Sequence, residues 1–432
     1  MRGRSIYVKK KPFLIAMLLF LIVEIVVGSA DTIGFAIMRL TVCFLFVYCI
    51  YRGINEEFIS NPYLLFSLTP FSLLLYSEKI SSYYFAKLEY KTWILAIINI
   101  LAFVMTLNYG IKKNKNWIGS GEETTELDCK CTNVTYHIVL LTIISKIPLV
   151  SNALGISFPL KSILGFFSFI GIALAFRTKK KWLIVFTILA NMTGWIQDFN
   201  KTRLMYLVMT VLVSLEAYYI KTKKDRVRLI AGLGVVAFFI LVVSFPLKSF
   251  TRAGGSFSDF FGNMTEISTN AFSKYNNRIS FLGPQVLQMP YMYLVSAWNN
   301  VQYVMNTQPE CTYGLWTLKP ILGYLQLDGM FADYYQLIPS SSFNTFTYIT
   351  VLFKDFGYYG SIVGSIILGL YVSSRYCKMK IEASCFDVAT YGLVAMATLE
   401  MFFSNHFFSL SYPFTIFIIG YIYKKIFRLE GY

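Results

Sequence analysis

The chain carries little charge for its length. Asp, Glu, Lys and Arg make up 14% of its 432 residues, against about 25% in an ordinary soluble domain. Soluble domains of this total length would need many more polar groups to cover their surface. Hydrophobic residues make up 56% of the chain and the mean hydropathy is +0.55. The sequence therefore predicts membrane spans of about 20 residues each.

Histidine and cysteine are also scarce. The two histidines, His137 and His406, are far apart, and only Cys129 and Cys131 among the seven cysteines are close neighbours, as C-x-C. A structural zinc site needs about four nitrogen or sulfur ligands at short spacings. The sequence therefore predicts no metal site, no other cofactor and no disulfide framework.

Long apolar runs dominate what is present. They predict an all-α polytopic membrane protein with about 12 transmembrane helices. The expected spans cover residues 12–28, 33–51, 62–77, 92–109, 135–152, 159–176, 182–199, 204–220, 229–245, 358–374, 386–402 and 412–423. The first run, after Lys9–Lys11, has the form of a signal peptide, but the many later runs favour an uncleaved span.

The positive charges predict the orientation. With the N-terminus in the cytoplasm, alternate loops place 25 of the 39 Lys and Arg residues inside, as the positive-inside rule requires. Both termini are then cytoplasmic. The same bias explains the basic clusters at 177–181 and 221–228 beside anionic membrane lipids, so no nucleic acid is expected as a partner. The outside loop 78–91, with three lysines, fits this scheme least well.

The spans and loops divide the chain into five parts. Residues 1–110 hold spans one to four, and 135–245 hold spans five to nine. A polar cytosolic linker, 111–134, separates them. Residues 246–357 form one large extracytoplasmic loop, and 358–432 hold the last three spans. About a fifth of the large loop is aromatic, which argues against disorder, and residues 291–305 predict a helix at the membrane interface.

Several short motifs at the end of this loop carry a family resemblance. Residues 342–348 read SFNTFTY, residues 353–360 read FKDFGYYG, and residues 364–369 read GSIILG. Upstream, residues 314–320 read GLWTLKP, and the turn Asn200–Arg203 begins a span. This pattern resembles the Wzy-type oligosaccharide repeat unit polymerases of bacterial O-antigen, capsule and exopolysaccharide pathways. Leu318 stands where the family has an aromatic residue. The resemblance covers mainly residues 195–375.

The resemblance implies a fold and an activity. The fold would be that of membrane-embedded lipid-sugar glycosyltransferases in the bacterial cytoplasmic membrane. The enzyme would move a glycan from undecaprenyl pyrophosphate to another lipid-linked repeat unit at the outer face of that membrane. Lipid-linked oligosaccharides and membrane lipids would be its partners, together with a chain-length regulator protein, and no metal would be needed.

Such a reaction needs cations for its pyrophosphate leaving group. The arginine guanidinium matches phosphate oxygens with two parallel hydrogen bonds. The arginines expected outside are Arg203, Arg252 and Arg278, and Lys201 lies close to the first of them. Each of these residues also has a structural interpretation, as a charge at a span end or in a solvated turn.

The acceptor hydroxyl needs a base or a positioning group. His406 lies in a short turn and is the only histidine expected outside, with Asp355 and Asp198 as alternatives. His406 could instead anchor its turn, and Asp355 could cap the helix that begins near Tyr358. Five ionisable residues fall within apolar runs, where they serve either a polar seam or internal pairing: Glu24, Arg39, Lys146, Glu216 and Glu400.

Two other functions fit the same composition. A flippase of lipid-linked oligosaccharides would also have about twelve spans, but usually has related halves and short loops. An O-antigen ligase would use a different acceptor, and His406 would suit it. The long aromatic loop favours an enzyme over a flippase, and the motifs at 342–360 resemble polymerases more closely than ligases.

Overall fold

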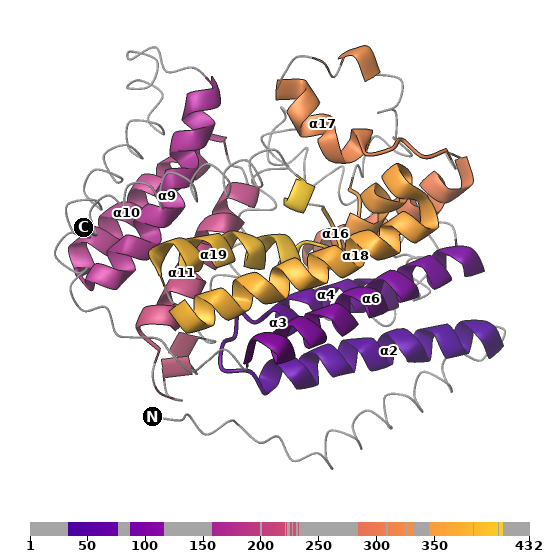
Figure 1. Ribbon diagram of the computed structural model, residues 1–432, viewed down its shortest axis with the longest axis horizontal. Helices are drawn as coiled ribbons and strands as arrows, with labels where there is room; N and C mark the ends of the chain where they lie inside the picture. The colour runs from indigo at the N-terminus through magenta and orange to yellow at the C-terminus, as the bar shows by residue number, and fades with distance from the viewer. Residues whose placement is uncertain are drawn as a thin grey trace. The chain divides into compact units, whose positions relative to one another are not determined.

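The computed structural model describes the chain in several stretches (Figure 1). They are residues 33–76, 87–115, 158–198, 201–220, 284–307, 310–324, 345–382, 384–404 and 406–408, with a few single residues between 222 and 331. The regular structure in these stretches is helical. The expected spans 12–28, 135–152 and 412–423, and nearly all of 229–245, lie outside the described residues.

The chain forms two compact units, and each unit combines segments far apart in the sequence. The first contains mainly α2 (Ile33–Ile54), α3 (Pro62–Phe66), α4 (Leu68–Tyr76), α6 (Tyr90–Lys115), α16 (Pro284–Thr307), α17 (Leu315–Tyr324), α18 (Tyr348–Glu382) and the 3-10 turn η5 (His406–Phe408). The second contains α9 (Phe158–Thr178), α10 (Lys181–Asp198), α11 (Lys201–Tyr218) and most of α19 (Cys385–Leu399).

Three described helices are long and apolar enough to cross a membrane. They are Gly34–Ile54, Tyr90–Asn114 and Tyr348–Ile381, the last of which turns sharply at Gly357, so that residues 358–381 form its long arm. Their exposed side chains are largely apolar, as on α6, where Ile94, Ile98, Leu101 and Met105 are 40–62% exposed along one face. A helix that is apolar on its exposed face as well as its buried face is typical of a lipid environment. The chain therefore has the character of a membrane protein.

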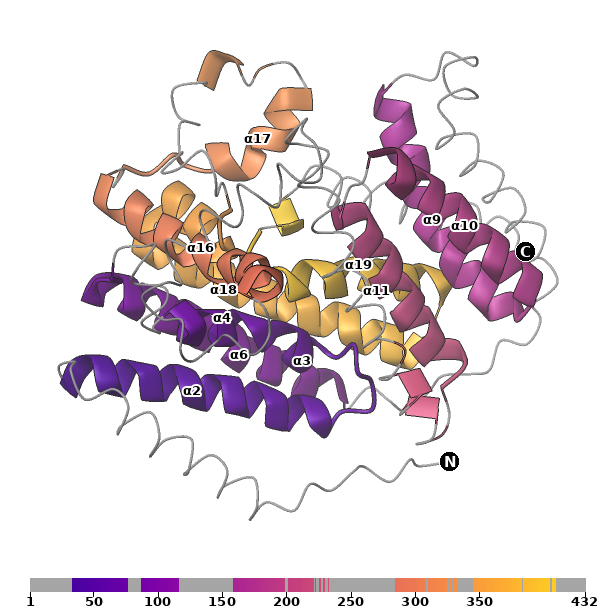
Figure 2. The ribbon, with the colours of Figure 1, turned by 180° about the vertical axis from the view of Figure 1, so that it is seen from behind.

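Helices α2 and α6 and the part of α18 after Gly357 lie alongside one another in the first unit (Figures 1 and 2). At the beginning of α2 and α6, the rings of Phe35 and Tyr90 meet edge to face with centroids 5.7 Å apart. Toward the other end, Arg52 Nη2 donates to Asn108 Oδ1 at 3.0 Å. We call these two ends of the first unit the Tyr90 end and the Arg52 end.

Small residues allow α6 and α18 to approach closely. Ser361, Ser365, Gly369 and Ser373 recur every four residues on α18. A Cβ atom on Gly369 would lie 2.7 Å from the carbonyl oxygen of Phe103 on α6. Small residues at such a spacing let two helix backbones approach closely, which stabilises helix packing in a membrane, where the hydrophobic effect does not drive helices together. They fix α18 against α6 along most of its length.

Helix α18 is a hairpin rather than a single rod. Gly357 has φ +66° and ψ −163°, a conformation that is strained for any residue with a Cβ. Beyond this turn, a Cβ on Gly364 would lie 2.6 Å from Leu352 Cδ2. In a straight helix these two residues would be about 18 Å apart. Residues 348–356 therefore fold back against residues 358–382.

The hairpin bears on two predictions made from the sequence. A helix does begin directly after the turn, where the span 358–374 is expected, and it continues to Glu382. Residues 348–356, the last part of the expected large loop, form a helix packed against it. The bounds of the loop and its extracytoplasmic position stay predictions.

The span expected at 62–77 is confirmed as an apolar helical stretch, Pro62–Tyr76, which consists of two short helices joined at Ser67. Helix α3 ends at Phe66 and α4 begins at Leu68. The Asn61 side chain caps α3 by accepting from Leu64 N, and Ser67 Oγ donates to the Leu64 carbonyl at the break. The helices expected at 33–51, 92–109, 159–176, 182–199, 204–220 and 386–402 are likewise confirmed as helices. The total of twelve spans stays a prediction.

Helix α16 confirms the helix expected at 291–305, but its centre is buried. Trp298 is fully buried, and its Nε1 donates to Ser72 Oγ at 2.9 Å. The ring therefore packs inside the first unit instead of lying open at an interface. Asn300 Nδ2 donates to the Thr345 carbonyl at 2.6 Å, which ties α16 to the segment that leads into α18.

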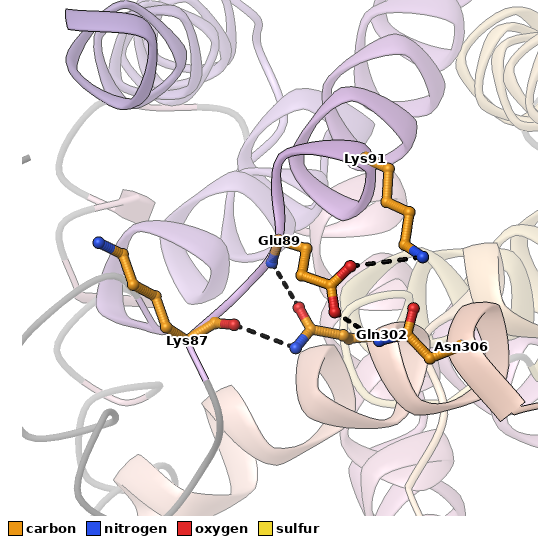
Figure 3. Close-up of polar contacts among 5 residues, drawn as sticks. All are labelled: Lys87, Glu89, Lys91, Gln302 and Asn306. Carbon is orange, nitrogen blue, oxygen red and sulfur yellow. Dashed lines mark hydrogen bonds and ion pairs between the residues drawn. The ribbon is translucent and has the colours of Figure 1, made fainter. Parts of the chain in front are cut away.

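Hydrogen bonds join the end of α16 to the residues before and at the start of α6 (Figure 3). Gln302 pairs with the backbone on both sides: its Nε2 donates to the Lys87 carbonyl at 3.0 Å, and its Oε1 accepts from Glu89 N at 2.5 Å. The Glu89 carboxylate accepts from Asn306 Nδ2 at 2.5 Å and lies 3.3 Å from Lys91 Nζ. The Asn306 hydrogen bond is the main reason that the pKa of Glu89 lies below its usual value, with Lys91 adding to the effect.

The second unit is built around α9, α10 and α11, which all contact one another. Hydroxyls and amides on these apolar helices bond to carbonyls one turn back, as Thr187 Oγ1 does to Leu183. Gly392 of α19 faces Thr210 of α11, because a Cβ there would lie 2.8 Å from its Cα. Small residues, and polar residues whose side chains bond to the backbone of their own helix, therefore permit close packing in this unit as well.

Candidate functional site

The turn of the α18 hairpin holds Asp355, whose side chain is fully buried. Its Oδ1 accepts from Thr312 Oγ1 at 2.6 Å and from Trp316 N at 2.9 Å. Its Oδ2 accepts from Thr317 N at 2.6 Å and from Thr317 Oγ1 at 2.5 Å. A buried carboxylate needs such partners, because an unpaired charge would be costly inside the protein.

Asp355 therefore caps α17, which begins at Leu315. Two backbone N–H groups in the first turn of that helix point at the carboxylate, and the positive end of the helix dipole favours its charge. This corrects the expectation that Asp355 caps its own helix near Tyr358. The capped helix is 38 residues upstream, so local spacing could not reveal the pair.

Further bonds join the same two segments. Thr312 N donates to the Lys354 carbonyl and Tyr313 N to the Asp355 carbonyl, both at 2.9 Å. Lys354 is 6% exposed, and its Nζ donates to the Glu310 carbonyl at 2.9 Å. The ring of Phe356 lies against Gly314, whose Cβ would be 3.5 Å away. The GLWTLKP and DFGYYG motifs thus form one assembly.

His406 lies in η5, just after α19. Its Nε2 is 2.5 Å from Glu400 Oε2, and the two side chains are only 14% and 13% exposed. The turn η5 packs near α17, the helix that Asp355 caps. The structure therefore places both candidate bases, His406 and Asp355, around α17. It gives them different surroundings, because the oxygens of Asp355 accept four bonds from the protein.

Glu400 is the residue of this site that the sequence did not single out. It was expected only as one of several ionisable residues within apolar runs. A signal for the pair was present, because an acidic residue at the end of an apolar run stands six residues before the only histidine of the region. The irregular turn between them follows no helical or strand period, so the pairing could not be inferred from periodicity.

The candidate cations lie elsewhere in the chain. Lys201 and Arg203 are in the first turn of α11, as expected for the start of a span, and their side chains are outside the described part of the structure. The same holds for the side chain of Asp198 at the end of α10. Arg252 and Arg278 lie wholly outside the described residues. Their roles stay predictions.

The described residues hold no cluster of three His, Cys, Asp or Glu side chains that could ligate a metal ion. What they offer is a buried, hydrogen-bonded scaffold around α17 and a histidine–carboxylate pair beside it. Such a pair can accept a proton from a hydroxyl group and hold the resulting imidazolium. Comparison of the chain with protein-family models, curated proteins and solved structures finds no match.

Proposed function

We propose that the protein polymerises bacterial surface polysaccharide in the cytoplasmic membrane. It transfers a glycan from undecaprenyl pyrophosphate to the sugar end of another lipid-linked repeat unit at the outer face. The observation that carries this proposal is the contact between the two motif regions. Residues 314–320 and 353–360, which resemble polymerases when read separately, meet through the Asp355 carboxylate.

The arrangement of the first unit supports the membrane setting. Lys112, Lys113, Arg375, Lys378 and Lys380 belong to the parts of α6 and α18 toward the Arg52 end. The hairpin turn lies toward the Tyr90 end, because Ser361, four residues after it, bonds to Asn99, whereas Ser373 lies against Gly110 further along α6. With positive charge inside, the motif assembly faces outward.

The proposed reaction is a substitution at a sugar carbon. The acceptor hydroxyl oxygen attacks the anomeric carbon of the donor glycan and forms the new glycosidic bond. The bond from that carbon to pyrophosphate breaks, and undecaprenyl pyrophosphate leaves with the bonding electron pair. His406 takes the hydroxyl proton, while Arg203, Arg252, Arg278 and Lys201 are the candidates to stabilise the anionic leaving group.

Asp355 takes a positioning role in this scheme. Its carboxylate is fully buried and accepts four hydrogen bonds, so a substrate hydroxyl would have to displace a protein donor to reach it. We therefore assign the proton transfer to His406 and assign to Asp355 the fixing of α17 against the hairpin turn.

Deleting the gene from its bacterium tests the proposal. Loss of long surface chains with single repeat units retained is the expected result, because linkage of units fails while their synthesis and export continue. Loss of every surface unit would instead indicate a flippase or a ligase. Complementation with the intact gene controls for effects on neighbouring genes. Complementation with an Asp355→Asn variant, whose membrane level is measured, tests the residue that joins the two motif regions.

A further inference from the structure

The pair formed by His406 and Glu400 is largely enclosed by protein. The Nε2–Oε2 distance is 2.5 Å and both side chains are less than 15% exposed. A hydrogen bond to an ionised carboxylate is shorter and stronger than one between neutral groups. The orientation of the His406 ring is therefore set by Glu400.

The backbone around Glu400 is held on both sides. Phe403 N and Ser404 N both donate to the Glu400 carbonyl at 2.8 Å, which closes the turn after α19. Tyr348 N donates to the Met401 carbonyl at 3.0 Å, which joins this turn to the start of the α18 hairpin. The carboxylate is thus presented from a fixed backbone.

The pairing also determines which ring nitrogen carries the proton. A neutral imidazole has one N–H donor and one acceptor nitrogen, and an ionised carboxylate can only accept. Nε2 is therefore the donor to Glu400, and Nδ1 is the nitrogen that can take up a proton. The imidazolium that forms keeps its bond to the carboxylate and gains an opposite charge beside it.

We propose that Glu400 is a positioning residue for His406: it holds the imidazole in the Nε2–H tautomer, so that Nδ1 is the nitrogen that removes the acceptor's proton. This proposal rests on the proposed function. The charged groups described on the two helices that contact η5 are Lys319 on α17 and, on α18, Lys354, Asp355, Arg375, Lys378 and Lys380. Lys354 and Asp355 have the partners given above. Lys319 and Arg375 point to aromatic rings, with Lys319 Nζ 4.9 Å from the centre of the Trp316 ring and the Arg375 guanidinium 5.4 Å from that of Tyr371.

The chain suits a direct spectroscopic test, because it has only two histidines. A His137→Asn variant labelled with 15N-histidine gives the signals of His406 alone. We expect the neutral imidazole of the otherwise unchanged protein to be the Nε2–H tautomer, and a mixture of tautomers when Glu400→Gln is added, since an amide can donate as well as accept. A predominant Nδ1–H tautomer before that change would overturn the assignment.

Chain extension by the purified protein, supplied with lipid-linked repeat units, gives the second measurement. Glu400→Gln should lower kcat by about 10²–10⁴-fold with KM little changed, because a carboxylate that fixes the tautomer of a catalytic histidine acts on the chemical step. Glu400→Asp should recover part of the loss. Glu56→Gln is the matched control, since Glu56 accepts a hydrogen bond from Tyr376 at the Arg52 end and should leave kcat unchanged.

The outcomes separate this proposal from the proposed function. No chain extension by the unmodified protein overturns the proposed function, and with it any catalytic role for Glu400. Normal extension by the unmodified protein and by Glu400→Gln overturns the Glu400 assignment alone. A loss in Glu400→Gln that Glu400→Asp does not reduce, with the tautomer unchanged in both, assigns Glu400 to folding and overturns the positioning role.

Discussion

Asp355 places a carboxylate in the interior of the first unit, where four donors hold it. Asparagine at this position has one acceptor oxygen, and its NH₂ group would face donors. We expect Asp355→Asn to lower the free energy of unfolding by about 2–4 kcal/mol, because hydrogen bonds to a charged group are lost and buried donors are left unpaired. Thermal unfolding of the purified protein in detergent measures the change.

Asp387 supplies the control for that substitution. It lies in the first turn of α19, and its carboxylate accepts from the hydroxyl of Ser384, whose Oγ accepts from Asp387 N in turn. Asp387→Asn therefore weakens only one local hydrogen bond, from the hydroxyl of the Ser384 cap, and should cost no more than about 1 kcal/mol. Equal stability of the two variants would show that Asp355 does not join α17 to the hairpin.

His406→Gln tests the base assigned to the reaction. Glutamine can keep a hydrogen bond to Glu400 but cannot take up a proton, so the rate of chain extension should fall on the order of 10²–10⁴-fold. Normal extension by the variant would remove His406 from the chemistry.

Arg203 and Arg252 are the arginines to test as pyrophosphate ligands. Alanine at either position should slow chain extension by roughly 30- to 1,000-fold, which corresponds to a loss of about 2–4 kcal/mol of transition-state stabilisation. Lysine should restore part of the rate, since it keeps the charge but not the two-pronged donor. The variants must reach the membrane at normal levels, and full activity of both alanine variants would exclude these side chains.

The sequence predicts single residues better than it predicts their partners. It indicated His406 and Asp355, because few ionisable residues are available near the expected outer face. It could not indicate that Asp355 caps a helix 38 residues away, because that contact depends on how the hairpin packs. It noted Glu400 only as a charge in an apolar run, although the structure pairs it with His406.

The sharp turn of the α18 hairpin depends on the backbone conformation of Gly357. Its φ of +66° and ψ of −163° are accessible to glycine but cost about 1–3 kcal/mol for other residues. An added Cβ would also lie 3.3 Å from Cys311 Sγ. We expect Gly357→Ala to lower the free energy of unfolding by about that amount, with a lower midpoint of thermal unfolding as the measurement.

Gly232→Ala is the control for the hairpin, because a Cβ at Gly232 would meet no atom within 4 Å. An unchanged midpoint for Gly357→Ala would contradict the hairpin.

The sequence predicts the start of the span after Gly357 from its apolar residues. It does not predict the fold-back of 348–356, because a positive φ at one glycine leaves no periodic pattern.

The first unit, taken as a whole, agrees with the alternation of loops predicted from charge. The sequence assigns α2, α6 and the main part of α18 to spans that all run inward from the outer face. The contacts Phe35–Tyr90, Arg52–Asn108 and Asn99–Ser361 show that these helices are parallel. Their agreement was not guaranteed, because one missed span between them would have made two of them antiparallel.

The exposed residues where α16 meets the residues before α6 give the sharpest test of this topology. Glu89, Lys91 and Asn306 are exposed at the Tyr90 end, and Lys112 is exposed near the C-terminal end of α6. In a background without native cysteines, Asn306→Cys should react with a membrane-impermeant maleimide in intact cells. Lys112→Cys should react only after the membrane is opened, because the positive charges keep that end in the cytoplasm. Labelling of Lys112→Cys in intact cells, with Asn306→Cys protected, would invert the protein and place the motif assembly on the wrong side for a polymerase.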